Sequence, residues 1–210
     1  MLPFRAAATA LLAAALSESP SAAAIIWNES LNGDLSNVQG TPTALALASG
    51  TNSIVGAVEG DTDPRDFVSL TVPVGKTLSS ITLFSYGSPD PQGFTGIQAG
   101  ASFVGSPFSA SSYAGYAHYG TGAVNGALPP TNLVGADLLP IMANPLLAVG
   151  ATGLTVPLAA GTYTFVIQQL GDAASYRFDY EVVPEPEVSS LCAAGLALLA
   201  WWRRRPRSAT

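Results

Sequence analysis

Hydrophobic and polar residues alternate along several short stretches of the chain, as they do in half-buried β-strands. In the clearest stretch, residues 175–182, aromatic and aliphatic side chains occupy every second position and mostly polar side chains occupy the others. Residues 161–169 show a similar alternation, and Gly171-Asp172 between the two stretches is a typical turn. We therefore predict two strands that pair with each other as a β-hairpin.

More strands are predicted along the rest of the chain. Residues 68–72 alternate and end at Pro73, which has no N–H for a ladder, and residues 78–86 form the next strand. Five shorter candidates are bounded mostly by turn residues: 25–28, 44–48, 53–58, 94–98 and 154–157. Eight or more short strands predict an all-β body, a β-sandwich or jelly roll. One segment with helical spacing, 133–142, predicts a short helix or turn in a connection.

The first residues have the three-part layout of a secretory signal peptide. A single cation, Arg5, precedes an apolar stretch over residues 6–16, and the segment closes on Ala22-Ala23-Ala24. Small residues at this spacing predict cleavage after Ala24 by the secretion machinery. The predicted domains are therefore a signal peptide (1–24), a β-sandwich (25–183) and a C-terminal tail (184–210).

The tail combines a short apolar run with a basic end. After Pro184, Glu185 and Pro186, fifteen weakly polar to apolar residues (188–202) lead to four arginines: Arg203, Arg204, Arg205 and Arg207. The run is shorter than the roughly 17 to 25 residues of most membrane-spanning helices, and the arginines should stay on the cytoplasmic face. We expect a temporary stop in the membrane. A permanent tail anchor and a core helix are the alternatives, and four cations beside a buried end argue against the core helix.

This order of Pro-Glu-Pro triplet, short hydrophobic helix and arginine cluster resembles the PEP-CTERM signal of exported bacterial proteins. The resemblance implies an exosortase as partner, a membrane protease-transpeptidase that removes such tails. It also implies export through the inner membrane, transient anchoring, and delivery to the cell surface or the extracellular space.

Two stretches of the body resemble the bacterial pre-peptidase C-terminal domain, a small jelly-roll-like accessory module. Residues 63–75 are similar to its acidic turn, aromatic strand and Val-Pro-x-Gly stop, and residues 158–165 to its Leu-x-x-Gly-x-Tyr entry to the closing strands. The long middle, 86–153, departs from the family's pattern. The resemblance implies at most a distant relative with an insertion.

Charge and cysteine content narrow the possible partners. Residues 25–183 contain three basic and eleven acidic side chains, which disfavours binding to a nucleic acid. The one cysteine, Cys192, lies in the apolar run of the tail, so the body has no disulfide and relies on burial for stability.

Catalytic patterns are sparse in the body. The single histidine, His118, has no Gly-x-Ser-x-Gly elbow or nucleophilic cysteine to accompany it, and one histidine without cysteines cannot supply the usual zinc ligands. Paired carboxylates for glycoside hydrolysis depend on a distance that the sequence does not give. We interpret His118 as a loop residue and expect a protein that is not an enzyme and has no cofactor.

An acidic turn over residues 59–66 is the best candidate metal site. Asp61, Asp63 and Asp66 could offer several of the oxygen ligands that calcium prefers. The spacing is not that of an EF-hand loop, because Val72 occupies the twelfth position counted from Asp61, and Arg65 neutralises part of the charge. An ordinary soluble turn between strands is the alternative.

Three tyrosines surround His118: Tyr113, Tyr116 and Tyr119. Their flat amphipathic rings could stack on sugars, or they could pack a glycine-rich loop. Two functions follow. We expect a non-catalytic exported protein with a structural or adhesive role at the cell surface or in the extracellular matrix. The alternative is a carbohydrate-binding or enzyme-accessory module that binds extracellular polysaccharide, stabilised by calcium.

Overall fold

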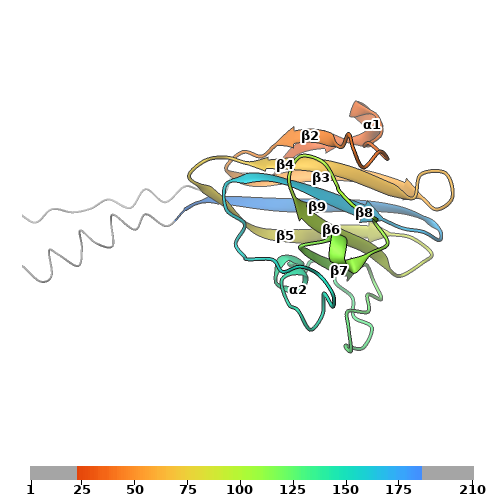
Figure 1. Ribbon diagram of the computed structural model, residues 1–210. Coiled ribbons are helices and arrows are strands. Elements are labelled where there is room, and N and C mark those ends of the chain that lie inside the picture. Colours follow the sequence, from red (N-terminus) through yellow and green to blue (C-terminus); the bar gives the residue numbers. More distant parts are fainter. Residues whose placement is uncertain (1–22, 186–210) are drawn as a thin grey trace, which may run out of the picture.

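The computed structural model describes residues 23–185, which form two β-sheets that face each other (Figure 1). One sheet has four strands in the order β1-β3-β9-β5, and the other has five in the order β2-β4-β8-β6-β7. The strands of the first sheet are β1 (Ala24–Asn28), β3 (Gly50–Glu59), β9 (Ala173–Pro184) and β5 (Lys76–Gly87). Those of the second are β2 (Thr43–Ala46), β4 (Arg65–Val72), β8 (Gly161–Gln168), β6 (Gly93–Ala99) and β7 (Gly115–Tyr119). The predicted all-β sandwich is confirmed.

The pairing is mostly antiparallel. β1 runs parallel to β3, and β2 runs parallel to β4, at one edge of each sheet. Three short helical segments lie in the connections: α1 (Glu29–Asn32), the 3₁₀ turn η1 (Ala110–Ser112) and α2 (Leu139–Met142).

The main core lies between the two sheets and is built by the alternation seen in the sequence. On β9, the side chains of Tyr176, Phe178 and Tyr180 point inward and are almost completely buried. The Phe178 ring meets Tyr119 of β7 edge to face, with centroids 5.1 Å apart, and Tyr180 meets Phe165 of β8 at 5.5 Å. Aromatic pairs across the two sheets therefore fix how the sheets stack.

The predicted hairpin is wrong. β8 pairs with β4 and β6, whereas β9 pairs with β3 and β5 in the opposite sheet. The turn at Gly171-Asp172 is therefore a crossover between the sheets. Both strands present an apolar face to the main core, and two such faces can meet across the core whether or not the strands pair with each other.

Two other expectations need correction. Residues 154–157 form no strand and contain a cis peptide bond at Val156-Pro157; one isolated bridge between Leu158 and Leu78 follows. His118 lies on the unpredicted strand β7, not in a loop. The short helix or turn predicted over 133–142 is a turn at Val134-Gly135 followed by α2.

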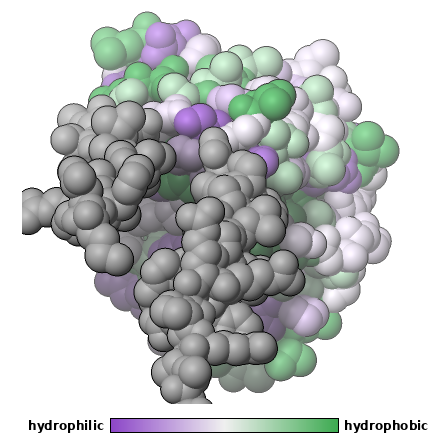
Figure 2. Space-filling model, turned by 90° about the vertical axis from the view of Figure 1, so that its left-hand side faces the viewer, coloured by the Kyte–Doolittle hydropathy of each residue, from purple (hydrophilic) through white to green (hydrophobic). Residues whose placement is uncertain are grey.

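The chain enters and leaves the sandwich at the same end. β1 begins where β3 begins, and β9 ends there because it runs antiparallel to β3 (Figure 1). On the visible part of this end, hydrophobic and hydrophilic residues are interspersed (Figure 2). Ala24, the last residue of the predicted signal peptide, pairs with Asn52 of β3. Pro184 closes β9, and the Glu185 N–H donates to the Gly75 carbonyl at 3.0 Å.

The rest of the two predicted sorting segments lies outside the described residues. This applies to residues 1–22 and to Pro186 with the arginines that follow it: Arg203, Arg204, Arg205 and Arg207. Within residues 23–185, no helix has the length and apolar character needed to cross a bilayer.

Candidate functional site

A second group of hydrophobic side chains lies on the outer face of the five-stranded sheet, away from the main core. Phe67 of β4 and Val166 of β8 are buried there, together with Phe103 and Tyr113 from the segment that follows β6. Phe94 of β6 and Tyr116 of β7 pack against them. The sheet thus buries apolar residues on both faces, and residues 100–114 cover part of the outer one.

The covering segment is held down by hydrogen bonds from the sheet. The Gln98 side chain donates to the carbonyl groups of Val104 and Ser112, at 3.0 and 2.6 Å, and accepts from the Val104 N–H at 2.8 Å. The Tyr113 hydroxyl donates to the Pro107 carbonyl at 2.7 Å. Gly96 makes room for the Tyr113 ring, since a Cβ there would lie only 2.4 Å from it. Residues 100–114 are therefore held in place against the outer face of the sheet, where they form a wall.

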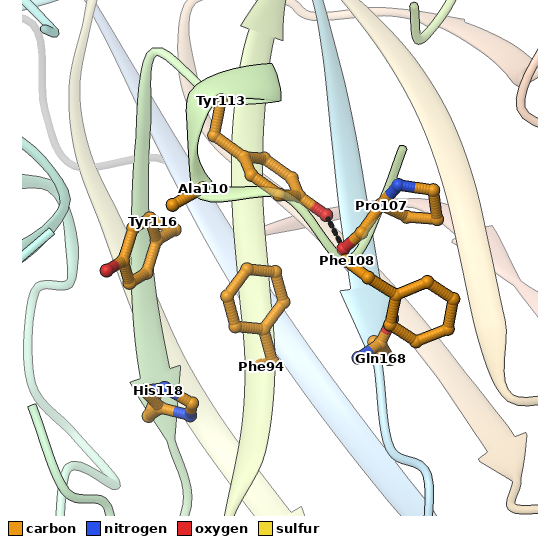
Figure 3. A pocket seen from close by; sticks show the side chains of 8 residues that line it. All are labelled: Phe94, Pro107, Phe108, Ala110, Tyr113, Tyr116, His118 and Gln168. Carbon is orange, nitrogen blue, oxygen red and sulfur yellow. Dashed lines mark hydrogen bonds between the residues drawn. The ribbon is translucent and has the colours of Figure 1, made fainter. Parts of the chain in front are cut away.

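Beside this wall lies an open depression that we call the outer groove. It consists of two adjoining hollows of about 280 and 350 Å³, which share Phe94, His118 and Gln168. Figure 3 shows the first hollow, with Phe94 at its centre, Tyr116 and His118 from β7 on one side, and Phe108 on the other. The second continues toward the β8–β9 connection and is lined by Asp90, Gln92, Gly93, Gln169, Leu170 and Gly171. This end of the groove is opposite to the end where the chain enters and leaves.

Aromatic faces and hydrogen-bonding groups alternate in the groove. The Arg65 guanidinium lies over the Phe108 ring, 4.4 Å from its centroid, and Arg65 Nε donates to Gln168 Oε1 at 2.5 Å. Phe108 is 70% exposed, so one face of its ring is open. Burial lowers the pKa of His118 and so favours the neutral imidazole, although a hydrogen bond to the Gly93 backbone opposes the shift.

The three tyrosines predicted to bind a ligand do not lie on one surface. Tyr116 lines the groove, and its hydroxyl donates to the Val149 carbonyl at 2.9 Å. Tyr113 borders the groove but is 99% buried, since its exposed fraction is 1%. Tyr119 points through the opposite face of the sheet into the main core and has no exposed surface. Tyr119 is therefore unable to contact a ligand.

The groove is suited to binding. Its lining residues include no serine, threonine, cysteine or lysine, and Asp90 is their one carboxylate. Asp90 Oδ1 accepts the Gln92 N–H at 2.9 Å and so closes a local turn. Stacking on rings and hydrogen bonding to neutral polar groups are the interactions that this surface offers.

A separate group of carboxyls lies where β4 begins, and we call it the acidic cluster. It contains Glu29 of α1, Asp34 and Asp66, which can each bring one oxygen within 4.8 Å of the others. Asp63 adjoins them and interacts with Asp34. The exposed Asp61 of the predicted calcium set is not part of this group.

Burial dominates the electrostatics of this cluster. It raises the pKa of Asp66 to about 9, although a hydrogen bond from the Tyr176 hydroxyl opposes the shift. Burial also raises the pKa values of Glu29 and Asp63. Arg65, which was expected to neutralise the acidic turn, points to the outer groove instead, because neighbouring residues of β4 face opposite sides of the sheet.

Sequence reasoning missed much of both sites. In the groove it missed Phe94 and Gln168, because each lies in a strand and nothing in the local sequence sets it apart from other strand residues. In the acidic cluster it missed Glu29 and Asp34, more than twenty residues before the acidic turn. An acidic residue at the start of a short helix was the one available signal for Glu29.

In the comparisons with known proteins, no family model, no curated protein and no solved structure matches the chain. The resemblances to the PEP-CTERM signal and to the pre-peptidase C-terminal domain therefore stay predictions. The fold, the outer groove and the acidic cluster are the features that bear on function.

Proposed function

We propose that the chain is an exported, non-catalytic β-sandwich protein that acts by binding at the cell surface or in the extracellular matrix. In this proposal the secretion machinery reads residues 1–24, and an exosortase-type protease-transpeptidase reads the tail that begins at Pro184. The observation that carries the binding role is the outer groove, where aromatic faces and neutral hydrogen-bonding groups occur without a nucleophile.

The placement of the groove supports this role. The predicted sorting segments join the sandwich at one end, at Ala24 and Glu185, and the groove opens toward the other. A domain that is held at its terminal end, in a membrane or on a carrier, would present the groove outward.

Intact-mass analysis of the protein from its native host tests the sorting part of the proposal. We expect a mature form that starts at Ile25 and has lost Arg203 to Arg207. A mature C-terminus that keeps these arginines would contradict processing by an exosortase and would indicate a tail anchor.

A carbohydrate-binding or enzyme-accessory module is the second candidate, and the chemistry of the groove favours it. Sugars present C–H faces that stack on aromatic rings and hydroxyl groups that pair with amide and imidazole side chains. Phe94, Tyr116 and Phe108 supply rings, and His118 and Gln168 supply polar groups next to them. The ligand of this candidate is a neutral polysaccharide.

Two exposed phenylalanines provide a matched test of the groove. Phe108 borders the groove under Arg65, and Phe84 of β5 lies under Arg177 on the outer face of the other sheet, with guanidinium-to-centroid distances of 4.4 and 3.8 Å. On an array of neutral polysaccharides we expect Phe108→Ala to lose binding and Phe84→Ala to keep it. No binding by the unchanged protein, or equal loss in both variants, would refute the polysaccharide role.

A further inference from the structure

We propose that Glu29, Asp34 and Asp66 bind a calcium ion that links α1 and the segment after it to β4 of the sandwich. The three carboxyls come from three different parts of the fold: α1, the segment after it, and the first residues of β4. This site is independent of the outer groove and goes beyond the proposed function.

The geometry of the three carboxyls fits one ion. Their closest oxygens lie within 4.8 Å of one another. Calcium binds oxygen at about 2.3 to 2.6 Å, so two ligands on opposite sides of one ion are separated by about twice that distance. Glu29 is already fixed in place, because its Oε1 accepts the Leu35 N–H at 3.1 Å and its Oε2 accepts the Ala57 N–H at 2.6 Å.

Asp66 supplies an observation that is independent of the distances in the cluster. Its side chain is completely buried, and Oδ2 accepts the Tyr176 hydroxyl at 2.5 Å. The other oxygen, Oδ1, is buried without any hydrogen-bond partner among the described residues, and so is Asp63 Oδ1 beside the cluster. A buried acceptor without a partner is costly, and a cation at the cluster would satisfy it.

No described basic side chain compensates the charge of the cluster. Arg65 contacts Phe108 and Gln168 on the outer face of the sheet, and Arg177 pairs with Asp179. Lys76 starts β5, opposite Pro184, at the other end of the sandwich. Positive charge must therefore come from bound protons or from a metal ion.

The donor set selects the kind of ion. All three side chains offer hard oxygen ligands, and no histidine or cysteine of the described residues accompanies them. Calcium accepts irregular geometry, whereas magnesium requires a near-regular octahedron, so three carboxyls from different parts of the fold suit calcium better. Asp34 is exposed, so solvent can reach the cluster and complete the coordination with water.

The test uses the full-length protein, stripped with EDTA and then titrated with calcium chloride. We expect the melting temperature to rise by about 5 °C or more at saturating calcium, because the ion binds the folded chain and not the unfolded one. Terbium chloride provides a second readout, since Tyr176, which bonds to Asp66, should sensitise terbium emission, and calcium should displace it.

Two variants that remove one exposed carboxyl each make the test specific. Asp34→Asn should lose the calcium shift and the terbium signal, whereas Asp61→Asn, outside the cluster, should keep both. Absence of both signals in the unchanged protein would overturn the proposal. It would also be overturned if Asp61→Asn lost them equally, or if magnesium chloride raised the melting temperature as much as calcium does.

Discussion

Replacing Asp66 with asparagine should remove a pH dependence that burial of this carboxyl gives to the fold. Burial raises the pKa of Asp66 to about 9, whereas an aspartate in an unfolded chain titrates near 3.9. Between these values, and without a bound cation, the folded chain holds a proton that the unfolded chain releases. The free energy of unfolding must therefore fall as the pH rises through this window.

The size of the effect follows from one proton. A difference of one bound proton changes the free energy of unfolding by up to about 1.4 kcal/mol per pH unit. From pH 5 to pH 8 the Asp66 contribution amounts to roughly 4 kcal/mol, a large part of the stability of a typical domain. Glu29 and Asp63, whose pKa values are also raised, act in the same direction.

Asparagine has the shape of a protonated aspartate and still accepts a hydrogen bond from Tyr176. In EDTA, the Asp66→Asn variant should match the unchanged protein at pH 5 and exceed its stability at pH 8. Urea unfolding, followed by intrinsic fluorescence at several pH values, measures the free energy of unfolding of each protein. Asp61→Asn is the control, and its free energy of unfolding should depend on pH as that of the unchanged protein does. The reasoning is refuted if the unchanged protein is equally or more stable at pH 8 than at pH 5, or if Asp66→Asn keeps its slope.

Three further substitutions test the packing. Phe178→Ala empties the centre of the aromatic core and should lower the free energy of unfolding by about 3 to 5 kcal/mol in urea titrations; a loss below about 1 kcal/mol would contradict its central place. Gly96→Ala should displace the Tyr113 ring and lower the melting temperature, and an unchanged midpoint would show that the ring does not lie on the sheet there. The Asn125 side chain accepts a hydrogen bond from the His118 backbone N–H and donates one to the His118 carbonyl. Asn125→Ala should therefore lower the free energy of unfolding by about 1 to 3 kcal/mol and speed amide exchange at His118. Unchanged exchange at His118 would contradict these two hydrogen bonds.

The alternation along β8 and β9, together with the other short strand candidates, predicted an all-β sandwich, because each half-buried strand has to bury an apolar face. It was not enough to predict partners. β8 and β9 each present apolar side chains to the main core, and the packing of the whole chain decides that they stack across it. β7 was missed because its short Gly-Tyr-Ala-His-Tyr sequence lies among turn residues, and its pairing with β6 is what gives it an extended conformation.

The two sites depend on tertiary structure in the same way. Tyr116 was among the residues singled out in the sequence, but whether it or Tyr119 faces outward depends on which side of β7 meets the core. Asp66 was found by its place in an acidic turn. Glu29 joins it through the pairing of β1 with β3, which no local pattern indicates.

The central position of β9 also determines how the protein would carry mechanical load. β9 pairs with β3 on one side and β5 on the other along nearly its whole length, and its last residue, Pro184, is the point where the predicted sorting tail begins. If the chain is attached through its C-terminal end, a pull between a ligand in the outer groove and that end would run through the β8–β9 connection and along the axis of β9. Because β9 pairs on both sides, any lengthwise slip of this strand would have to shear the ladder hydrogen bonds to both neighbours together, since these bonds lie across its axis. In that arrangement β9 would resist being pulled out of its sheet.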